Sequence, residues 1–456
     1  MEHHWHHWRH RGGAAIHSPP RRVHGVEPPT EQSWSVLASP RGRAILGDPP
    51  DSQLRGRLVV PPARADIAVI GGGLAAIILG ARLSQLGMLD QTVLLDPRPV
   101  LGARFFERLD RIQQPILRTP YGHHLAPAGG RCPDLLEFAQ AVADCLTPPE
   151  REQIRLAREG RPSLVPVDVF QAHTRRIVDA YSLPPVHHRG LVRSVRPRRG
   201  QFLLELASGR LLARNVIFAT GEEPRRLEGA RSILRAAWRF STAILDDPDG
   251  DRDEGEVAVI GGGLTAAAIA VATARHGGHV SWVVRNQERF ARLDAKEEYF
   301  RTEGVARFTA LDLRGRTRAL FVERRASVIP EFQPLLAALE HDGKLTIHRH
   351  RVITDAREQD AGLRVHLSDG TTIDAARVVS AIGMRTCLAP SLSPSRCCRW
   401  TAHLPHLHDD TLEVVGVPGA FVIGASAQLS MGPAARAIQG MRMAADRILP
   451  HLTGRL

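Results

Sequence analysis

The sequence predicts an α/β protein with two nested parallel-sheet units, each carrying a β-meander, and an N-terminal tail without regular structure. A strand, glycine turn, helix and second strand follow one another at 66–96, and the same order recurs at 256–285. Alternating strands follow each copy, and the chain closes with one more strand and a long helix that must return to a sheet. These observations predict two Rossmann-like dinucleotide-binding domains.

The first 61 residues show neither strand nor helix periodicity and are rich in proline, arginine and histidine, so we expect a disordered tail. Four histidines in it are candidate ligands for a stray transition metal: His3, His4, His6 and His7. No acid partner or fixed geometry accompanies them, which favours a solvated tail over a built site. We therefore predict no metal site.

The first glycine turn has the residues that a nucleotide pyrophosphate requires. The apolar strand 67–70 meets three glycines and passes into a helical pattern. Gly71 permits the tight turn, Gly73 lets a pyrophosphate approach bare backbone, and Ala76 is small enough for the helix to lie on the sheet. The phosphates would lie at the helix N-terminus, where free N–H groups and the helix dipole favour anions. Asp96 ends the second strand and is expected to accept hydrogen bonds from ribose hydroxyls.

The second glycine turn repeats the first but ends differently. Gly261, Gly263 and Ala266 hold the positions of the three small residues of the first copy, and the second strand ends in Arg285 instead of an aspartate. An acid at this position suits a free 2′-hydroxyl, whereas a guanidinium suits a 2′-phosphate. We therefore predict FAD or NAD at the first site and NADPH at the second.

Composition restricts the class of protein. A chain of 456 residues accommodates two or three domains, and no apolar run approaches the ~20 residues needed to cross a bilayer, so we expect no membrane partner. The net charge of +12 comes almost entirely from arginines interleaved with acids, so we predict no nucleic-acid partner. Five cysteines form no disulfide framework, which favours a reducing cytoplasm.

Loops and helices at about 100–185 follow the first βαβ pattern and are expected to fold over the cofactor. They supply donors suited to a flavin ring or a reduced nicotinamide: Gln113, Gln114, Arg118, His123 and His124. Gln114 and Arg118 are our candidates for the polar ring of the catalytic site. The alternative, that these residues only anchor loops, carries equal weight.

The strand ends and the C-terminal segment complete the predicted sites. The meander at 186–221 ends in Thr220 and Gly221, and the passage 363–383 repeats this arrangement. Gly424 follows the last strand, and Gly432 with Pro433 begins a helix whose N–H groups would face the flavin. The predicted organisation is a tail at 1–61, an FAD-binding domain at 62–225 and 386–456, and an NAD(P)H-binding domain at 226–385.

The paired glycine turns, Ala219-Thr220-Gly221, its echo Ala381-Ile382-Gly383 and the terminal glycines resemble the two-dinucleotide-binding-domain flavoproteins. Among these, the chain is similar to class B flavin monooxygenases, which include the lysine and ornithine N-hydroxylases, over residues 62–452. The resemblance implies FAD at Gly71, Gly73, Ala76 and Asp96, closed by Gly424 and the Gly432 helix, and NADPH at Gly261, Gly263, Ala266 and Arg285.

The chain departs from these relatives at several positions. Neither cysteine spacing of the flavin disulfide reductases is present, and a disulfide between the adjacent Cys397 and Cys398 would be strained. The interval between Gly221 and Glu256 lacks the histidine of the monooxygenase signature, and Ala425 stands where an aspartate is usual.

Three functions are compatible with these features. The first is an NADPH-dependent flavin monooxygenase that uses O₂ to hydroxylate a nitrogen or sulfur of a small molecule. The second is an NAD(P)H:acceptor flavin reductase without oxygen insertion. The third is a non-catalytic flavin-binding regulatory protein.

Overall fold

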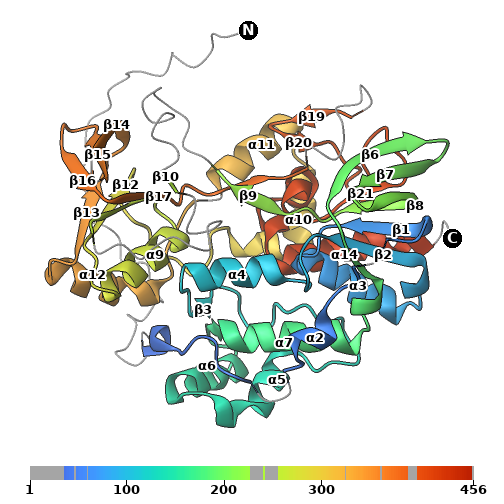
Figure 1. The fold of residues 1–456 in the computed structure, drawn as a ribbon, viewed down its shortest axis with the longest axis horizontal. Helices are drawn as coiled ribbons and strands as arrows, with labels where there is room; N and C mark the ends of the chain where they lie inside the picture. The colour runs from blue at the N-terminus through green and yellow to red at the C-terminus, as the bar shows by residue number, and fades with distance from the viewer. Residues whose placement is uncertain are drawn as a thin grey trace, which may run out of the picture.

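The computed structural model describes residues 35–45, 48–58, 60–225, 240–241, 255–323, 325–359, 362–388 and 398–453. The N-terminal histidines, the signature interval from 226 to 239 and Cys397 lie outside these ranges. Figure 1 shows a first sheet on the right and a second on the left, with α5, α6 and α7 below them. The α/β fold class predicted from the sequence is confirmed.

The first sheet is mostly parallel and is extended by an antiparallel meander. Its order is β5-β2-β1-β8-β7-β6, and β21 also pairs with β8. The predicted meander is present, because β6, β7 and β8 pair antiparallel. The strands are β1 (Arg64–Ile70), β2 (Thr92–Asp96), β5 (His187–Arg189), β6 (Val192–Arg198), β7 (Gln201–Leu206), β8 (Gly209–Phe218) and β21 (Ala420–Val422).

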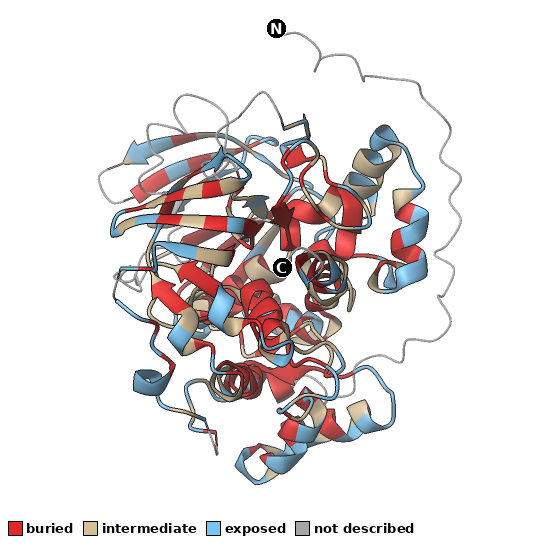
Figure 2. Ribbon diagram, turned by 90° about the vertical axis from the view of Figure 1, so that its right-hand side faces the viewer, coloured by how far each residue is buried: buried red, intermediate tan, exposed pale blue. Residues whose placement is uncertain are grey.

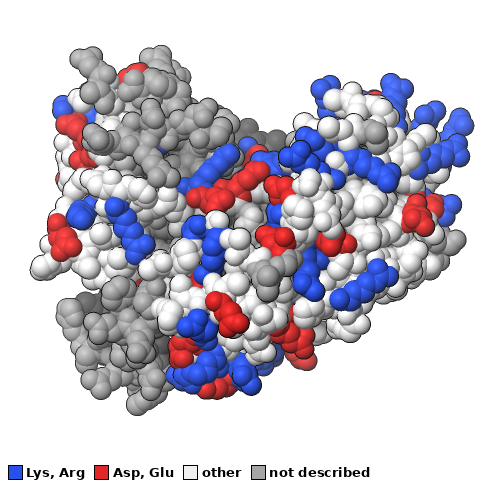
Figure 3. Space-filling view, turned by 60° about the horizontal axis from the view of Figure 1, so that its bottom comes forward, with Lys and Arg blue, Asp and Glu red and all other residues white. Residues whose placement is uncertain are grey.

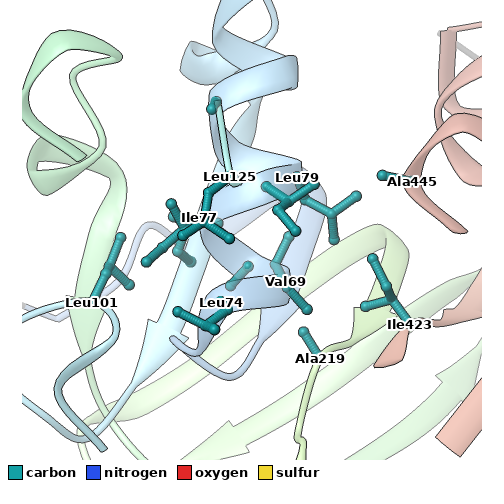
Figure 4. Close-up of a cluster of buried hydrophobic side chains, with 14 of the residues drawn as sticks. Val69, Leu74, Ile77, Leu79, Leu101, Leu125, Ala219, Ile423 and Ala445 are labelled. Carbon is teal, nitrogen blue, oxygen red and sulfur yellow. The ribbon is translucent and has the colours of Figure 1, made fainter. Parts of the chain in front are cut away.

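Helix α3 (Leu74–Gln85) lies against this sheet and is buried along most of its length, because eight of its twelve residues are Ala, Ile or Leu. Figure 4 shows its side chain Leu79 toward Val69 of β1 and Ile77 toward Leu101, with Ile423 and Ala445 of the C-terminal segment closing the same core. Figure 2 shows this buried centre in red between exposed outer edges.

The helices around the first sheet come from the predicted insert and from the C-terminus. The insert helices are α4 (Ala103–Arg111), α5 (Leu135–Ala141), α6 (Pro148–Arg158) and α7 (Val167–Ala180), with the short pair β3 (Ile116–Leu117) and β4 (Val165–Pro166). The C-terminal segment contains η7 (Gly424–Ala427), α13 (Gln428–Met431), η8 (Pro433–Arg436) and α14 (Ile438–Thr453).

The second unit has a parallel sheet of order β10-β17-β11-β12-β13 and a separate antiparallel meander of order β14-β15-β16. Helices α9 and α12 contribute to one apolar cluster of this unit, and the meander packs on the sheet strands in another. The strands are β10 (Phe240–Ser241), β11 (Val257–Ile260), β12 (Val280–Val284), β13 (Leu345–Arg349), β14 (Ile353–Gln359), β15 (Gly362–Leu367), β16 (Thr372–Ala375) and β17 (Arg377–Ser380). The helices are α9 (Leu264–Arg275), α10 (Thr302–Thr309), α11 (Leu313–Val322) and α12 (Gln333–His341), with the turn η5 (Glu297–Phe300).

The second unit is inserted into the first, because the chain completes the first sheet only with β21, after the second sheet has been built. Two chain segments connect the units. They are β9 (Glu222–Pro224) and β18 (Met384–Thr386), which pair antiparallel and form a two-stranded connection. The remaining short pair is β19 (Trp400–Thr401) with β20 (Leu404–Pro405).

The tail predicted for residues 1–61 is wrong for its second half. The turn η1 (Ser35–Ala38) contributes Val36 and Leu37 to the core of the second unit, and α2 (Asp51–Leu54) contributes the fully buried Leu54 to that of the first. Between them, Arg43 pairs with Glu150 of the insert. A few anchors and ion pairs hold this segment, which periodicity does not detect. We call residues 35–58 the N-terminal strap.

No described helix is long and apolar enough to cross a membrane. In the space-filling view of Figure 3, basic and acidic side chains are interspersed over the visible face.

Candidate functional site

The first glycine turn is shaped for an occupant at Gly73 and for close packing at Gly71. Gly71 has φ +110°, and a Cβ atom there would lie 2.3 Å from the carbonyl oxygen of Ala219. Only glycine therefore fits between β1 and the end of β8. A Cβ atom on Gly73 would meet nothing within 4 Å. Gly73 is also the N-cap of α3 and has no side-chain cap, so the helix N-terminus stands behind open space.

Asp96 lies beside this turn at the end of β2, as the sequence predicts. Its Oδ2 accepts a hydrogen bond from the Gly72 amide at 2.8 Å, and its Oδ1 accepts one from the Arg98 amide at 2.9 Å. The carboxylate is half-buried, so it keeps solvent-facing surface while being fixed against the turn. Ala76 is fully buried, which matches its predicted role in letting the helix lie on the sheet.

The second glycine turn has nearly the same geometry. Gly261 has φ +134°, and its Cβ atom would lie 2.3 Å from the carbonyl oxygen of Ala381. The indole Nε1 of Trp282, in β12, donates a hydrogen bond to the Gly261 carbonyl at 2.6 Å and so holds the turn in place. Gly262 has no neighbour within 4 Å of a built Cβ, and Gly263 has only the Ala326 methyl at 3.7 Å. Among the described residues, no side chain larger than a methyl group lies against these two glycines.

Two further residues of the second site are placed as the sequence suggests. Ala266 is fully buried in the first turn of α9, whereas Arg285 directly follows β12 and is exposed. Within the described ranges, no ion pair is formed by Arg285, and Arg289 is exposed one turn further on. The guanidinium is therefore accessible to a ligand at the end of the second strand.

The strand ends supply hydroxyl groups that have no partner within the described residues. The Oγ1 of Thr220 beside the first turn, the Oγ of Ser426 in η7 and the Oγ of Ser380 at the end of β17 are buried without a hydrogen bond. Gly221 has φ +68° and is exposed, and Gly424 has φ +79° with nothing within 4 Å of a built Cβ. Buried orphan hydroxyls and open glycines fit the binding of a polar ligand.

Ser426 and Ser380 were not predicted from the sequence as site residues. The available signal was their position, since each follows or ends a strand whose carboxyl end meets a glycine turn.

The helix expected directly after Gly432 starts later than predicted. Pro433–Arg436 forms a 3₁₀ turn, Ala437 is extended with ψ 157°, and the long helix α14 begins at Ile438. A Cβ atom on Gly432 would lie 3.3 Å from the Phe308 ring of α10. The backbone amides near Gly432 thus belong to a short turn covered on one side by the second unit.

Gln114 and Arg118 occupy different environments. Gln114 is buried, and its side-chain Nε2 donates to the Ile116 carbonyl at 2.8 Å, which anchors its own loop. Arg118 reaches from the first unit to the second, where its guanidinium donates to Ser327 Oγ at 3.1 Å and lies 4.0 Å from the Asp294 carboxylate. Arg118 therefore stands where the two units meet.

The two histidines of the same loop also lie near the second unit or the core. The ring of His123 stacks on Phe300 with centroids 5.7 Å apart. Burial lowers the pKa of His124 to about 4, so its imidazole is neutral near pH 7. His123 is also shifted, since burial and the nearby Arg442 lower its pKa.

The described cysteines do not form a dithiol pair. Cys132, Cys145 and Cys387 are free thiols. Cys387 lies nearest the first site, since its amide donates to the Gly221 carbonyl at 3.3 Å, but burial raises the pKa of its thiol to about 11. It is therefore protonated and a poor nucleophile near neutral pH. Over the same ranges, no three His, Cys, Asp or Glu side chains are grouped to hold a metal ion.

The chain has two open glycine turns, each at the carboxyl end of a parallel sheet, and a two-stranded connection joins the two units. This arrangement defines an oxidoreductase of the class with two dinucleotide-binding folds. The sequence pattern of the pyridine nucleotide-disulphide oxidoreductase family matches residues 186–440, more than half of the chain. The chain belongs to this family, which confirms the predicted enzyme class. Comparison with curated proteins gives no match.

Solved structures with the same fold include two amine-hydroxylating enzymes. The ornithine N-hydroxylase of Kutzneria sp. 744, determined with reduced FAD, NADP⁺ and L-ornithine, has a TM-score of 0.67 at 15% identity, covering 86% of this chain and 99% of that one. The cadaverine monooxygenase of Erwinia amylovora, bound to FAD, has a TM-score of 0.68 at 16% identity, covering 86% and 95%.

The bacillithiol disulfide reductase of Staphylococcus aureus is also similar, with a TM-score of 0.57 at 13% identity, covering 86% of this chain and 99% of that one. At these identities the similarity shows the fold, and it confirms the resemblance inferred from the glycine turns and strand ends.

Proposed function

We propose that the protein is an FAD-dependent, NADPH-using monooxygenase that hydroxylates a nitrogen or sulfur of a small molecule, with O₂ as co-substrate. The observation that carries the proposal is the pair of open, similarly built glycine turns, one beside an aspartate and the other beside an exposed arginine. The fold shared with the ornithine N-hydroxylase from Kutzneria and the cadaverine monooxygenase from Erwinia supports nitrogen as the atom attacked.

The first turn is proposed to hold FAD. Gly73 leaves room for the pyrophosphate at the N-terminus of α3, and Asp96, already oriented by the Gly72 amide, would accept from the ribose hydroxyls. The buried hydroxyls of Thr220 and Ser426 would find their missing partners on the same ligand. When bound, FAD accepts a hydride from the nicotinamide and activates oxygen.

The second turn is proposed to hold NADPH. Gly263 would admit the pyrophosphate, because only a methyl group lies near it. Arg285 would form charge-assisted hydrogen bonds with the 2′-phosphate, for which it is exposed and unpaired within the described chain.

Arg118 and Gln114 are proposed to shape the reaction site between the cofactors. Arg118 would hold the second unit against the first through Ser327 and so position the nicotinamide. Gln114 would keep its loop in place through its bond to the Ile116 carbonyl. We also propose that the substrate is a small molecule and that the protein is located in the cytoplasm.

The deciding experiment compares oxygen consumption, NADPH consumption, H₂O₂ release and the mass of the product with a panel of primary amines and thioethers. A monooxygenase adds one oxygen atom to a substrate and releases less H₂O₂ than it consumes NADPH. The similarity to a bacillithiol disulfide reductase favours one second candidate, an NAD(P)H:acceptor reductase without oxygen insertion. Release of H₂O₂ equal to the NADPH consumed, with every substrate tested, would favour that candidate and refute ours.

A further inference from the structure

Helix α11 carries an unusual concentration of exposed apolar side chains. Four of the nine large hydrophobic side chains exposed in the described residues lie between 311 and 322. They are Leu311 (42% exposed), Leu313 (40%), Phe321 (84%) and Val322 (42%). Figure 1 places α11 on the outside of the molecule. Single exposed hydrophobic residues are ordinary, whereas a cluster of this kind marks a contact surface.

Three arginines lie in or next to this helix. Arg314, Arg318 and Phe321 are four and three residues apart and therefore lie on one face of the helix, and Arg325 comes three residues after its end. Each of these arginines is exposed, and none makes an ion pair within the ranges described. The exposed acid nearest to them, Asp312, caps the helix by accepting from the Gly315 amide at 2.7 Å. We call Leu311, Arg314, Arg318, Phe321 and Val322 the α11 surface. Leu313 is left out because it lies three residues before Arg316 and seven before Leu320, on the other face of the helix.

The opposite face of α11 is firmly attached to the protein. Arg316 donates through both terminal nitrogens to the Asp409 carboxylate at 2.8 Å and also to the Leu429 carbonyl at 3.0 Å. Leu320 packs on the apolar cluster that contains Phe308. The exposed face is therefore presented by a fixed helix and is not a frayed end.

The combination of groups selects the kind of partner. Apolar side chains set among unpaired arginines match the interface of an anionic bilayer, where hydrocarbon accepts the first and lipid headgroups attract the second. A nucleic acid would satisfy the arginines, but its phosphates offer no apolar contact to Leu311, Phe321 and Val322. We propose that the α11 surface docks the protein on the surface of membranes that contain anionic lipids.

This proposal revises the expectation that the protein has no membrane partner, and it requires no spanning helix. It does not depend on the proposed enzymatic function.

Flotation of the full-length protein with vesicles tests it. We expect binding to vesicles of phosphatidylcholine with phosphatidylglycerol, little binding to pure phosphatidylcholine, and loss of binding in high salt because the attraction is screened. The variant Arg314→Glu/Arg318→Glu/Phe321→Ser should bind at least about 20-fold more weakly, since each arginine near an anionic surface contributes about fivefold.

A matched control changes the same kinds of residue on another surface. Leu191, Arg193 and Arg198 are also exposed, so Leu191→Ser/Arg193→Glu/Arg198→Glu has the same net charge and loses one exposed apolar side chain. It should bind vesicles as the unmodified protein does. Equal loss in both variants would show nonspecific attraction and overturn the proposal. So would failure to bind anionic vesicles, or α11-dependent binding of an RNA or an acidic polypeptide in place of vesicles. Circular dichroism of both variants checks that they are folded.

Discussion

Replacing Arg43 with methionine tests how the N-terminal strap is held to the helical insert. The carboxylate of Glu150 is fully buried and accepts two hydrogen bonds from Arg43, at 2.6 and 2.5 Å. Burial alone would raise the pKa of Glu150, but the bonds from Arg43 and the Thr147 amide outweigh it, so the pKa lies below its usual value. Methionine removes the charge while keeping most of the apolar stem.

Removing one partner of a buried ion pair costs about 3–5 kcal/mol, because the other charge remains buried without compensation. Glu150 keeps its bond from the Thr147 amide at 2.8 Å, so we expect a loss near the lower end, about 3 kcal/mol. The loss should be greatest at neutral pH and shrink in acid. A carboxyl with a lowered folded-state pKa stabilises the fold above its unfolded pKa, and this stabilisation disappears as pH falls through the folded pKa.

The assay is urea unfolding at pH 7.5 and pH 4, followed by circular dichroism, with Arg43→Met, Glu150→Gln and the double variant. The double variant should recover at least half of the loss, because a neutral amide costs less to bury than an unpaired carboxylate. A loss below about 1 kcal/mol in Arg43→Met, or a double variant no more stable than the single one, would refute the reasoning.

Three other predictions concern the cofactor sites and the buried histidines. Arg285→Asp should raise the KM for NADPH at least about 100-fold and change the KM for NADH little, because only NADPH has the 2′-phosphate; equal effects in steady-state kinetics would contradict the assignment. Gly73→Val should abolish FAD retention, measured by flavin absorbance after gel filtration, without unfolding the protein, because its side chain enters open space; retained FAD would place the pyrophosphate elsewhere. Burial lowers the pKa of His124, His173 and His187 from 6.5 to about 4. The unfolded chain therefore binds protons that the folded one does not, and stability should fall as pH drops from 6.5 to about 4; a melting temperature constant over that window would be inconsistent with neutral buried imidazoles.

The features predicted correctly from the sequence are those with a local cause. Positions 71 and 261 require glycine, because φ is positive there and an added Cβ would lie 2.3 Å from a carbonyl oxygen. Such a requirement is visible directly in the sequence as a glycine. The meanders follow from alternation of apolar and polar residues between short turns. The acid or arginine at the end of each second strand is likewise fixed by its place in the pattern.

The missed features depend on contacts between distant parts of the chain. Arg43 and Glu150 are 107 residues apart in the sequence, and Arg118 and Ser327 are 209 residues apart. No local sequence pattern can therefore predict either pair. The delayed start of α14 has the same origin, because Phe308 of the second unit packs on Gly432 where the helix was expected to begin. In these places tertiary contacts outweigh the local conformational propensity of the residues.

The late return of the chain to the first sheet has a consequence for synthesis. Strand β8 pairs with β1 on one side, but the slot beside its Val216–Phe218 end is filled only by β21, which leaves the ribosome some 200 residues later. Until then the nascent first unit has an unpaired parallel edge and an uncovered face of α3. Chaperones that shield hydrophobic surface should therefore be needed longest by this N-terminal half, and truncation before residue 420 should yield aggregates and not a smaller stable domain.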